Sequence, residues 1–195
     1  MMPMTRTTTA TGYATSDPIS DEYGRRRVYI TTDINDNVAA NICCQINQLA
    51  AQSDEDITLW IMSPGGSVSA GLAILDTMKA CRCDIRTVVM GCAASMAAVL
   101  ASSGTRGKRA IGQNGQMMIH QALGGVSGQT MDIIRTANHI QKTNNRLYTI
   151  LAENTGANIQ QIAADCDRDF YLDATEAISY GSYGLVDTIF NGFDD

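Results

Sequence analysis

The chain has 195 residues, of which 45% are hydrophobic and 17% are charged, and its formal net charge is −6 at pH 7. This length fits one compact domain with a single core, and the composition excludes a disordered or fibrous protein. The acidic balance disfavours nucleic-acid binding, which needs clustered Lys and Arg. No apolar run approaches the ~20 residues of a membrane span, and the first residues lack the apolar core of a signal peptide. We therefore expect a cytoplasmic protein with no membrane contact.

Six cysteines are present, and without an export signal they are expected to be reduced thiols. Cys81 and Cys83 look like half of a zinc site. A closed site needs a second pair of Cys or His ligands, which the sequence does not offer. We therefore expect no bound metal.

Residues 1–25 are rich in Thr, Ser, Gly and Asp and have no sustained apolar period, which predicts a flexible N-terminal segment. The folded domain is expected over residues 26–195. Its hydrophobic pattern predicts strands at 28–31, 57–62 and 85–90, and helices at 37–51 and 68–78. Because strands and helices alternate, the sheet should be mostly parallel.

The second half of the chain continues this alternation. A turn of small residues is expected at 91–94, a helix at 95–102, and short strands at 108–111 and 116–120. A glycine-rich hinge at 124–128 then leads into a predicted helix at 129–153. A helix of about 25 residues is ~37 Å long, more than a domain of this size can cover, so it should project and contact another subunit.

Ser95 is the candidate nucleophile. It lies where a buried strand gives way to a helix, between residues too small to crowd its hydroxyl and beside the positive end of the helix dipole. Ala93 and Ala97 occupy the glycine positions of Gly-x-Ser-x-Gly, so an α/β-hydrolase elbow is not supported. On local grounds alone, a helix N-cap is an equally good role for this serine.

Two histidines could activate a serine. His120 ends a predicted strand just before a loop, which favours it as the base, whereas His139 lies in the middle of a predicted helix. A triad also needs a carboxylate, and composition does not choose between Asp165, Asp167 and Asp169.

The Gly65–Gly66 pair follows a buried strand. Without Cβ atoms, its backbone N–H groups could approach an oxyanion closely, although a tight turn is the simpler reading of two adjacent glycines.

Taken in chain order, these segments resemble the ClpP peptidases, the proteolytic rings of energy-dependent proteases. The resemblance covers about residues 26–189, most of the chain. It is carried by Ser-Pro-Gly-Gly-Ser at 63–67, Gly-Cys-Ala-Ala-Ser-Met at 91–96, Met-Ile-His-Gln at 118–121, Gly-Gln at 128–129, Asp-Arg-Asp at 167–169, Glu-Ala at 176–177 and Tyr-Gly-Leu-Val-Asp at 183–187.

This resemblance implies a serine peptidase. Ser95 would be the nucleophile, His120 the general base and Asp169 the third member of the triad. Gly66 and Met96 would donate the oxyanion-hole N–H groups. The mechanism would be acyl transfer and would need no metal or cofactor.

The resemblance also implies an α/β fold, a ClpP/crotonase-type spiral of ββα units with a projecting handle helix at about 124–155. The assembly would be a homo-oligomer of two stacked seven-membered rings, or a mixed ring with a paralogue. Asp167, Arg168 and Gln129 would contact the opposite ring, and Trp60 would line the docking pocket for an AAA+ unfoldase such as ClpX, ClpA or ClpC. Unfolded proteins would be the substrates.

Some positions depart from the family pattern. Relative to the family pattern, the N-terminal signature is absent and three residues are inserted near Tyr180, before the Tyr-Gly-Leu-Val-Asp segment. Single departures lie near the site, at Met62, Cys92, Ala97, Ala122 and Phe170. Two other functions are open: a weakly active or regulatory subunit of a mixed ring, and an acyl-CoA enzyme of the crotonase fold. The second normally uses Glu or Asp as its acid and base, and no matching carboxylate pair is evident.

Overall fold

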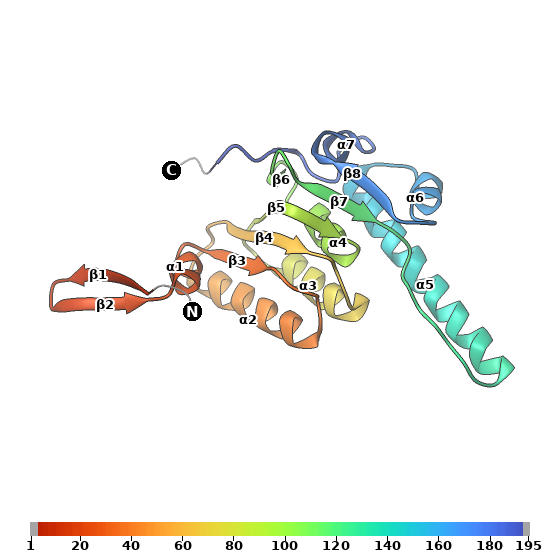
Figure 1. The fold of residues 1–195 in the computed structure, drawn as a ribbon, viewed down its shortest axis with the longest axis horizontal. Helices are drawn as coiled ribbons and strands as arrows, with labels where there is room; N and C mark the ends of the chain where they lie inside the picture. The colour runs from red at the N-terminus through yellow and green to blue at the C-terminus, as the bar shows by residue number, and fades with distance from the viewer. Residues whose placement is uncertain (1–3, 193–195) are drawn as a thin grey trace.

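In the computed structural model, which describes residues 4–192, a seven-stranded sheet forms the centre of the protein (Figure 1). Its main path runs β3–β4–β5–β6–β9, and every neighbouring pair on this path is parallel. These strands span Arg27–Ile30, Ile57–Ser63, Ile85–Ala94, Arg109–Ile111 and Thr188–Ile189. The expectation of an α/β fold with a mostly parallel sheet is confirmed.

Strand β5 is shared between two parts of the sheet. Its first half pairs with β6, and its second half, Cys92 to Ala94, pairs in parallel with β7 (Gln116–Ile119). β7 in turn pairs antiparallel with β8 (Phe170–Asp173). Residues 91–94 therefore continue a strand, and the prediction of a turn there is wrong: Ala93 and Ala94 are buried and pair with β7.

Three helices surround the first half of the sheet. α2 (Asp36–Gln52) packs against α3 (Val68–Ala80) and against β3, through an apolar stripe that contains Ile42, Ile46 and Leu49. All seven residues of α4 (Met96–Ser102) are buried. The helix that follows the candidate nucleophile is thus held on every side by the core.

Helix α5 (Thr130–Thr155) is 26 residues long and extends away from the body of the protein (Figure 1). Its C-terminal half is buried through Leu147 and Leu151, among others, whereas Met131 and Ile134 in its first half are exposed. It ends at Gly156, which adopts a left-handed conformation (φ 67°). No helix in the part of the chain described is both long and apolar enough to cross a membrane.

The N-terminal segment contains regular structure that the sequence pattern did not indicate. β1 (Thr5–Thr9) and β2 (Gly12–Ser16) form an antiparallel hairpin, and α1 (Pro18–Gly24) follows, with Asp17 as its N-cap. Both faces of β2 are largely exposed. The hairpin therefore needs no apolar alternation, which explains why a search for buried periodicity missed it.

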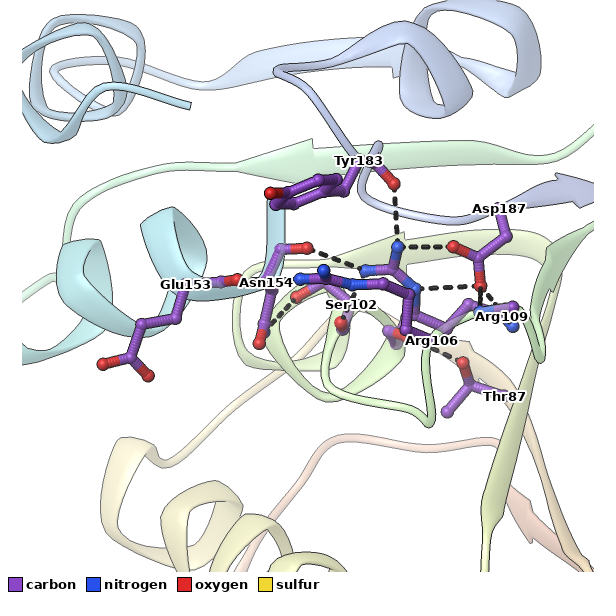
Figure 2. A network of polar contacts seen from close by, with 10 residues as sticks. Thr87, Ser102, Arg106, Arg109, Glu153, Asn154, Tyr183 and Asp187 are labelled. Carbon is purple, nitrogen blue, oxygen red and sulfur yellow. Dashed lines mark hydrogen bonds and ion pairs between the residues drawn. The ribbon is translucent and has the colours of Figure 1, made fainter. Parts of the chain in front are cut away.

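The C-terminal region is joined to the core by Arg109, whose side chain is 1% exposed (Figure 2). Its guanidinium forms an ion pair with Asp187 and donates hydrogen bonds to the backbone oxygens of Ser102, Asn154 and Tyr183. One side chain thus connects β6, the ends of α4 and α5, and the segment before β9. Two short helices complete the fold, α6 (Ile159–Asp165) and α7 (Ala174–Ser179).

Candidate functional site

Strand register brings the three candidate catalytic residues together. Ser95 directly follows β5, His120 directly follows β7, and Asp169 directly precedes β8. The pairing of β5 with β7 places Ser95 near the end of β7, and its N–H donates to Met118 O at 2.8 Å. The antiparallel pairing of Ile119 with the residue after Asp169 puts that aspartate opposite His120.

The side chains of these residues form a hydrogen-bonded chain. His120 Nε2 lies 2.8 Å from Ser95 Oγ, and His120 Nδ1 lies 3.0 Å from Asp169 Oδ1. With its proton on Nδ1, the imidazole donates to the carboxylate and leaves Nε2 free to accept the serine proton. The His120 side chain is 12% exposed, whereas that of Asp169 is 58% exposed. The imidazole is therefore largely buried, while the carboxylate at the end of this hydrogen-bonded series is in contact with solvent.

The backbone of Ser95 has a conformation that L-residues rarely adopt, with φ 55° and ψ −124°. Strain of this kind persists where the surrounding structure fixes it, and it is concentrated at functional sites. Although Ser95 occupies the N-cap position of α4, its side chain makes no capping hydrogen bond. The helix-cap alternative is therefore wrong, and the hydroxyl is directed to His120 instead.

The two glycines before α3 are tightly packed, Gly65 against the turn at Ser95 and Gly66 against Ile34. A Cβ on Gly65 would lie 2.8 Å from Ser95 Cβ and 3.0 Å from the Met96 nitrogen, and a Cβ on Gly66 would lie 2.3 Å from the Ile34 oxygen. Only glycine allows this close approach. Within residues 4–192, neither the Gly66 N–H nor the Met96 N–H donates a hydrogen bond. Two N–H groups close to the serine are therefore available to an incoming oxygen.

Two hollows adjoin Ser95. One is a small, largely apolar pocket with a volume of about 20 Å³, whose lining includes Val68, Met96, Val99, Ile119, Leu147 and Leu151. The other is a wider cleft of about 360 Å³, whose lining includes Gly66, Ser67, Ser95, Met118, His120 and Leu123. Val68, Ser95, His120 and Ala122 line both hollows, so the two adjoin each other at the serine.

The loop after His120 is fixed by a residue that the sequence did not indicate. Asn144 is 3% exposed, and its side-chain oxygen accepts a hydrogen bond from the Ala122 N–H at 2.7 Å. Gln121 fastens the same loop to the segment before Asp169, since its side-chain amide donates to Asp167 O at 2.9 Å. The sequence does contain a sign of this role. Asn144 lies three and seven positions before Leu147 and Leu151, so it is a polar residue on the apolar stripe of the helix.

None of the remaining candidates lines the two hollows at Ser95. Asp167 and Arg168 are exposed and lie 3.4 Å apart at their closest charged atoms, and Gln129 is exposed at the start of α5. His139 is exposed on α5 and takes no part in the triad. Trp60 is 8% exposed in β4.

Trp60 belongs to an aromatic cluster on the sheet. Its ring stacks on Tyr29 with 6.0 Å between centroids and meets the edge of Phe190 at 5.2 Å. Burial raises the pKa of Tyr29 to about 12, with a further contribution from its hydrogen bond to Glu22. This tyrosine therefore stays neutral at physiological pH.

Two residues at positions that depart from the ClpP pattern, Phe170 and Tyr180, contact each other. Phe170, the residue after Asp169, has its ring centroid 6.2 Å from that of Tyr180 in the inserted segment. The Tyr180 hydroxyl donates to Asp165 Oδ2 at 2.7 Å, and burial together with this carboxylate raises the pKa of Tyr180. Just after the insertion, the centroid of the Tyr183 ring lies 3.8 Å from the guanidinium carbon of Arg106. The insertion thus packs against the segment that carries Asp169.

All six cysteines are free thiols. Burial raises the pKa of Cys166 to about 12, with a smaller effect from Asp165, so this thiol is unreactive at neutral pH. Over residues 4–192, no group of three or more His, Cys, Asp or Glu side chains is placed to hold a metal ion.

Comparison with known proteins agrees with this geometry. Residues 10–192 match the Clp protease family. The chain is 44% identical to an ATP-dependent Clp protease proteolytic subunit of Streptococcus pyogenes serotype M5 (strain Manfredo), over 93% of this chain and 94% of the relative. Proteins of the same description from serotypes M49 (strain NZ131) and M1 show the same identity and coverage. The resemblance seen in the motifs is thereby confirmed, and the chain belongs to the Clp protease family.

Proposed function

We propose that this chain is the proteolytic subunit of a self-compartmentalised serine protease, which hydrolyses peptide bonds of unfolded proteins. The observation that carries the proposal is the hydrogen-bonded chain from Ser95 Oγ through the His120 ring to Asp169, with distances of 2.8 and 3.0 Å. A nucleophile, a base and an orienting carboxylate in this order are the requirements for acyl transfer.

In the proposed mechanism, His120 Nε2 takes the proton of Ser95 as Oγ attacks the carbonyl carbon of the scissile peptide bond. The resulting oxyanion is held by the N–H groups of Gly66 and Met96. His120 then gives its proton to the leaving amine, which departs and leaves an acyl-enzyme on Ser95. Water, activated by the same imidazole, hydrolyses this ester and restores the serine hydroxyl. Asp169 keeps the imidazole in the tautomer that accepts at Nε2.

The apolar pocket beside Ser95 is the proposed site for the substrate side chain next to the scissile bond. Its walls, Val68, Leu147 and Leu151 among them, favour a hydrophobic side chain. Its volume of about 20 Å³ holds no more than a water molecule, so α5 has to shift relative to α4 before a large side chain enters.

For the assembly we propose two stacked seven-membered rings, in which the first half of α5 reaches the opposite ring. The exposed Met131, Ile133 and Ile134 support this contact, since side chains of this kind are normally covered. Asp167, Arg168 and Gln129 would lie at the same contact. The Trp60 cluster and the N-terminal hairpin would face an AAA+ unfoldase, and the free thiols fit a reducing cytoplasm.

The proposed chemistry is tested on the assembled protein with a fluorophosphonate probe and a fluorogenic peptide. We expect the probe to modify Ser95, as located by mass spectrometry, and Ser95→Ala to abolish both labelling and cleavage. Ser179→Ala, in an exposed position on α7, is the matched control and should change neither. Cleavage that survives in Ser95→Ala would refute the proposal.

The native mass of the complex tests the assembly. A homo-oligomer of about 14 chains supports closed rings of one subunit. If this chain forms active rings only together with a paralogue, the mixed-ring alternative is correct.

A further inference from the structure

A second groove runs between the start of α3 and the exposed face of α5. It has a volume of about 640 Å³, and its α5 wall carries His139, Lys142 and Arg146. Residues spaced three to four and seven apart lie on one face of a helix, so these three side chains form a row along the groove. Ser67 and Ser69 line the opposite wall, at the N-terminus of α3.

The charge of this groove is opposite to that of the whole chain. The protein carries 20 acidic and 14 basic residues, yet no carboxylate lines the groove. In the part of the chain described, neither Lys142 nor Arg146 forms an ion pair, and Asp132, in the first turn of α5, pairs with Arg135. Two cations therefore face the groove without partners.

The α3 wall also makes the electrostatic potential of the groove more positive. The N-terminus of a helix carries a partial positive charge, and the first turn of α3 contains no acidic residue to offset it. Ser67 caps this helix and also lines the groove. Both walls thus favour negative charge.

The groove is continuous with the cleft over the catalytic serine. Ser67, Val68 and Leu123 line both hollows, and Val68 also borders the small apolar pocket. A peptide that lies over Ser95 therefore passes from the cleft into the basic groove without leaving the surface.

We propose that this groove is a substrate subsite for acidic side chains, in which Lys142 and Arg146 favour peptides that carry Asp or Glu a few positions from the scissile bond. The proposal rests on the peptidase function proposed above and deepens it, because it assigns a charge preference to residues outside the triad. The occupant is a segment of the unfolded substrate chain.

The expected effect follows from the strength of partly exposed charge pairs. Each such pair contributes modestly, so two cations together should raise kcat/KM for an acidic peptide about 3- to 10-fold over its neutral counterpart. Because salt screens exposed charges, the preference should fall towards 1 near 1 M salt, where the Debye length is about 3 Å.

The test uses the assembled protein and a panel of internally quenched peptides. All peptides share one apolar residue at the cleaved position, and Glu, Gln or Lys is placed in turn at each flanking position. We expect one or two positions at which Glu is cleaved fastest and Lys slowest in the wild-type protein at low salt. In Lys142→Gln/Arg146→Gln the Glu-to-Gln ratio should approach 1, and in Lys142→Glu/Arg146→Glu the order should reverse. Arg135→Gln, a cation on α5 outside the groove, should keep the wild-type ratio.

The outcomes separate the two proposals. Cleavage of all peptides at equal rates, whatever their charge, would overturn the acidic subsite and leave the peptidase function intact. An acidic preference that survives in Lys142→Gln/Arg146→Gln, or that does not weaken with salt in the wild-type protein, would also overturn the subsite. Failure to cleave any peptide would overturn both. The wild-type measurements decide the question even if the variants do not assemble.

Discussion

Arg109 and Asp187 form an ion pair in which the guanidinium Nε lies 3.1 Å from Asp187 Oδ2, and this pair meets α4 at the end opposite Ser95 (Figure 2). The same guanidinium donates to Ser102 O at the C-terminus of α4. It therefore satisfies a carbonyl that the helix leaves unpaired, and it places a positive charge at the negative end of the helix dipole. The helix that begins after Ser95, the candidate nucleophile, is thus held at both ends.

Asp187→Ala should destabilise the protein strongly. The substitution leaves a guanidinium that is 1% exposed without its carboxylate, and breaking a buried pair in this way costs about 3–5 kcal/mol. Thermal unfolding at a fixed protein concentration would measure the loss. Asp84→Asn removes a partner of Lys108 at an exposed ion pair and should cost about 1 kcal/mol or less. Equal losses for the two variants would contradict the role assigned to Arg109.

The same carboxylate predicts a pH dependence. Burial alone would raise the pKa of Asp187, but hydrogen bonds from Arg109 and Gly107 outweigh burial and hold the pKa below its ordinary value of 3.8. The unfolded chain therefore takes up this proton more readily than the folded chain. The contribution of Asp187 is complete above the ordinary pKa and is lost as the pH falls through the lowered one.

We therefore expect the wild-type protein to unfold at a higher temperature than Asp187→Asn. This difference should be constant from pH 7 to about 5 and should narrow below pH 4. Unfolding temperatures measured across this range would show it. A gap that stays the same at pH 3 would mean that the carboxylate contributes nothing through its charge.

Gly66→Ala should reduce both activity and stability. Its Cβ would lie 2.3 Å from the Ile34 oxygen, and its φ of 144° disfavours any L-residue, so the backbone has to move. Because Gly66 is a proposed oxyanion donor, we expect kcat to fall by about 10²- to 10³-fold. Gly125→Ala, at a position with open space around it and no positive φ, should leave kcat unchanged.

Much of the fold follows from local pattern. The strands at β3 and β4 and the helices at α2 and α3 lie within about two residues of their predicted bounds, because their apolar residues face one core. The prediction of secondary structure failed for segments in which burial produces no regular pattern of apolar residues. The β1–β2 hairpin has exposed faces, and α6 and α7 are too short to show a helical period.

The candidate site shows the same division. Local sequence left Ser95 between nucleophile and helix cap and left three aspartates equivalent, because the answer depends on register between strands that are far apart in the chain. The pairing of β7 with both β5 and β8 supplies that register. Arg109 could not be identified at all, since a basic residue in a short basic run normally faces solvent and here only the tertiary contacts bury it.

Asp169→Asn should lower kcat by about 10²- to 10⁴-fold, with little effect on KM. The amide would donate to His120 Nδ1, which puts the imidazole proton on Nε2 and leaves no acceptor for the serine proton. Steady-state kinetics with a short peptide would measure the loss. Asp54→Asn, an exposed partner of Arg82, is the charge-matched control and should retain full activity. Full activity in Asp169→Asn would exclude this aspartate from the triad.

Replacement of Ser95 itself should separate activity from stability. With φ 55° and ψ −124°, its backbone lies in a region that glycine adopts freely, and such strain costs about 1–3 kcal/mol for other residues. Ser95→Gly and Ser95→Ala should both be inactive, since each lacks the hydroxyl, but Ser95→Gly should unfold at the higher temperature. At Asn47, an exposed position in the middle of α2, the order of the glycine and alanine variants should be the opposite, because glycine in a helix interior is about 1 kcal/mol less favourable than alanine. If Ser95→Gly is the less stable of the pair, Ser95 is not held under backbone strain.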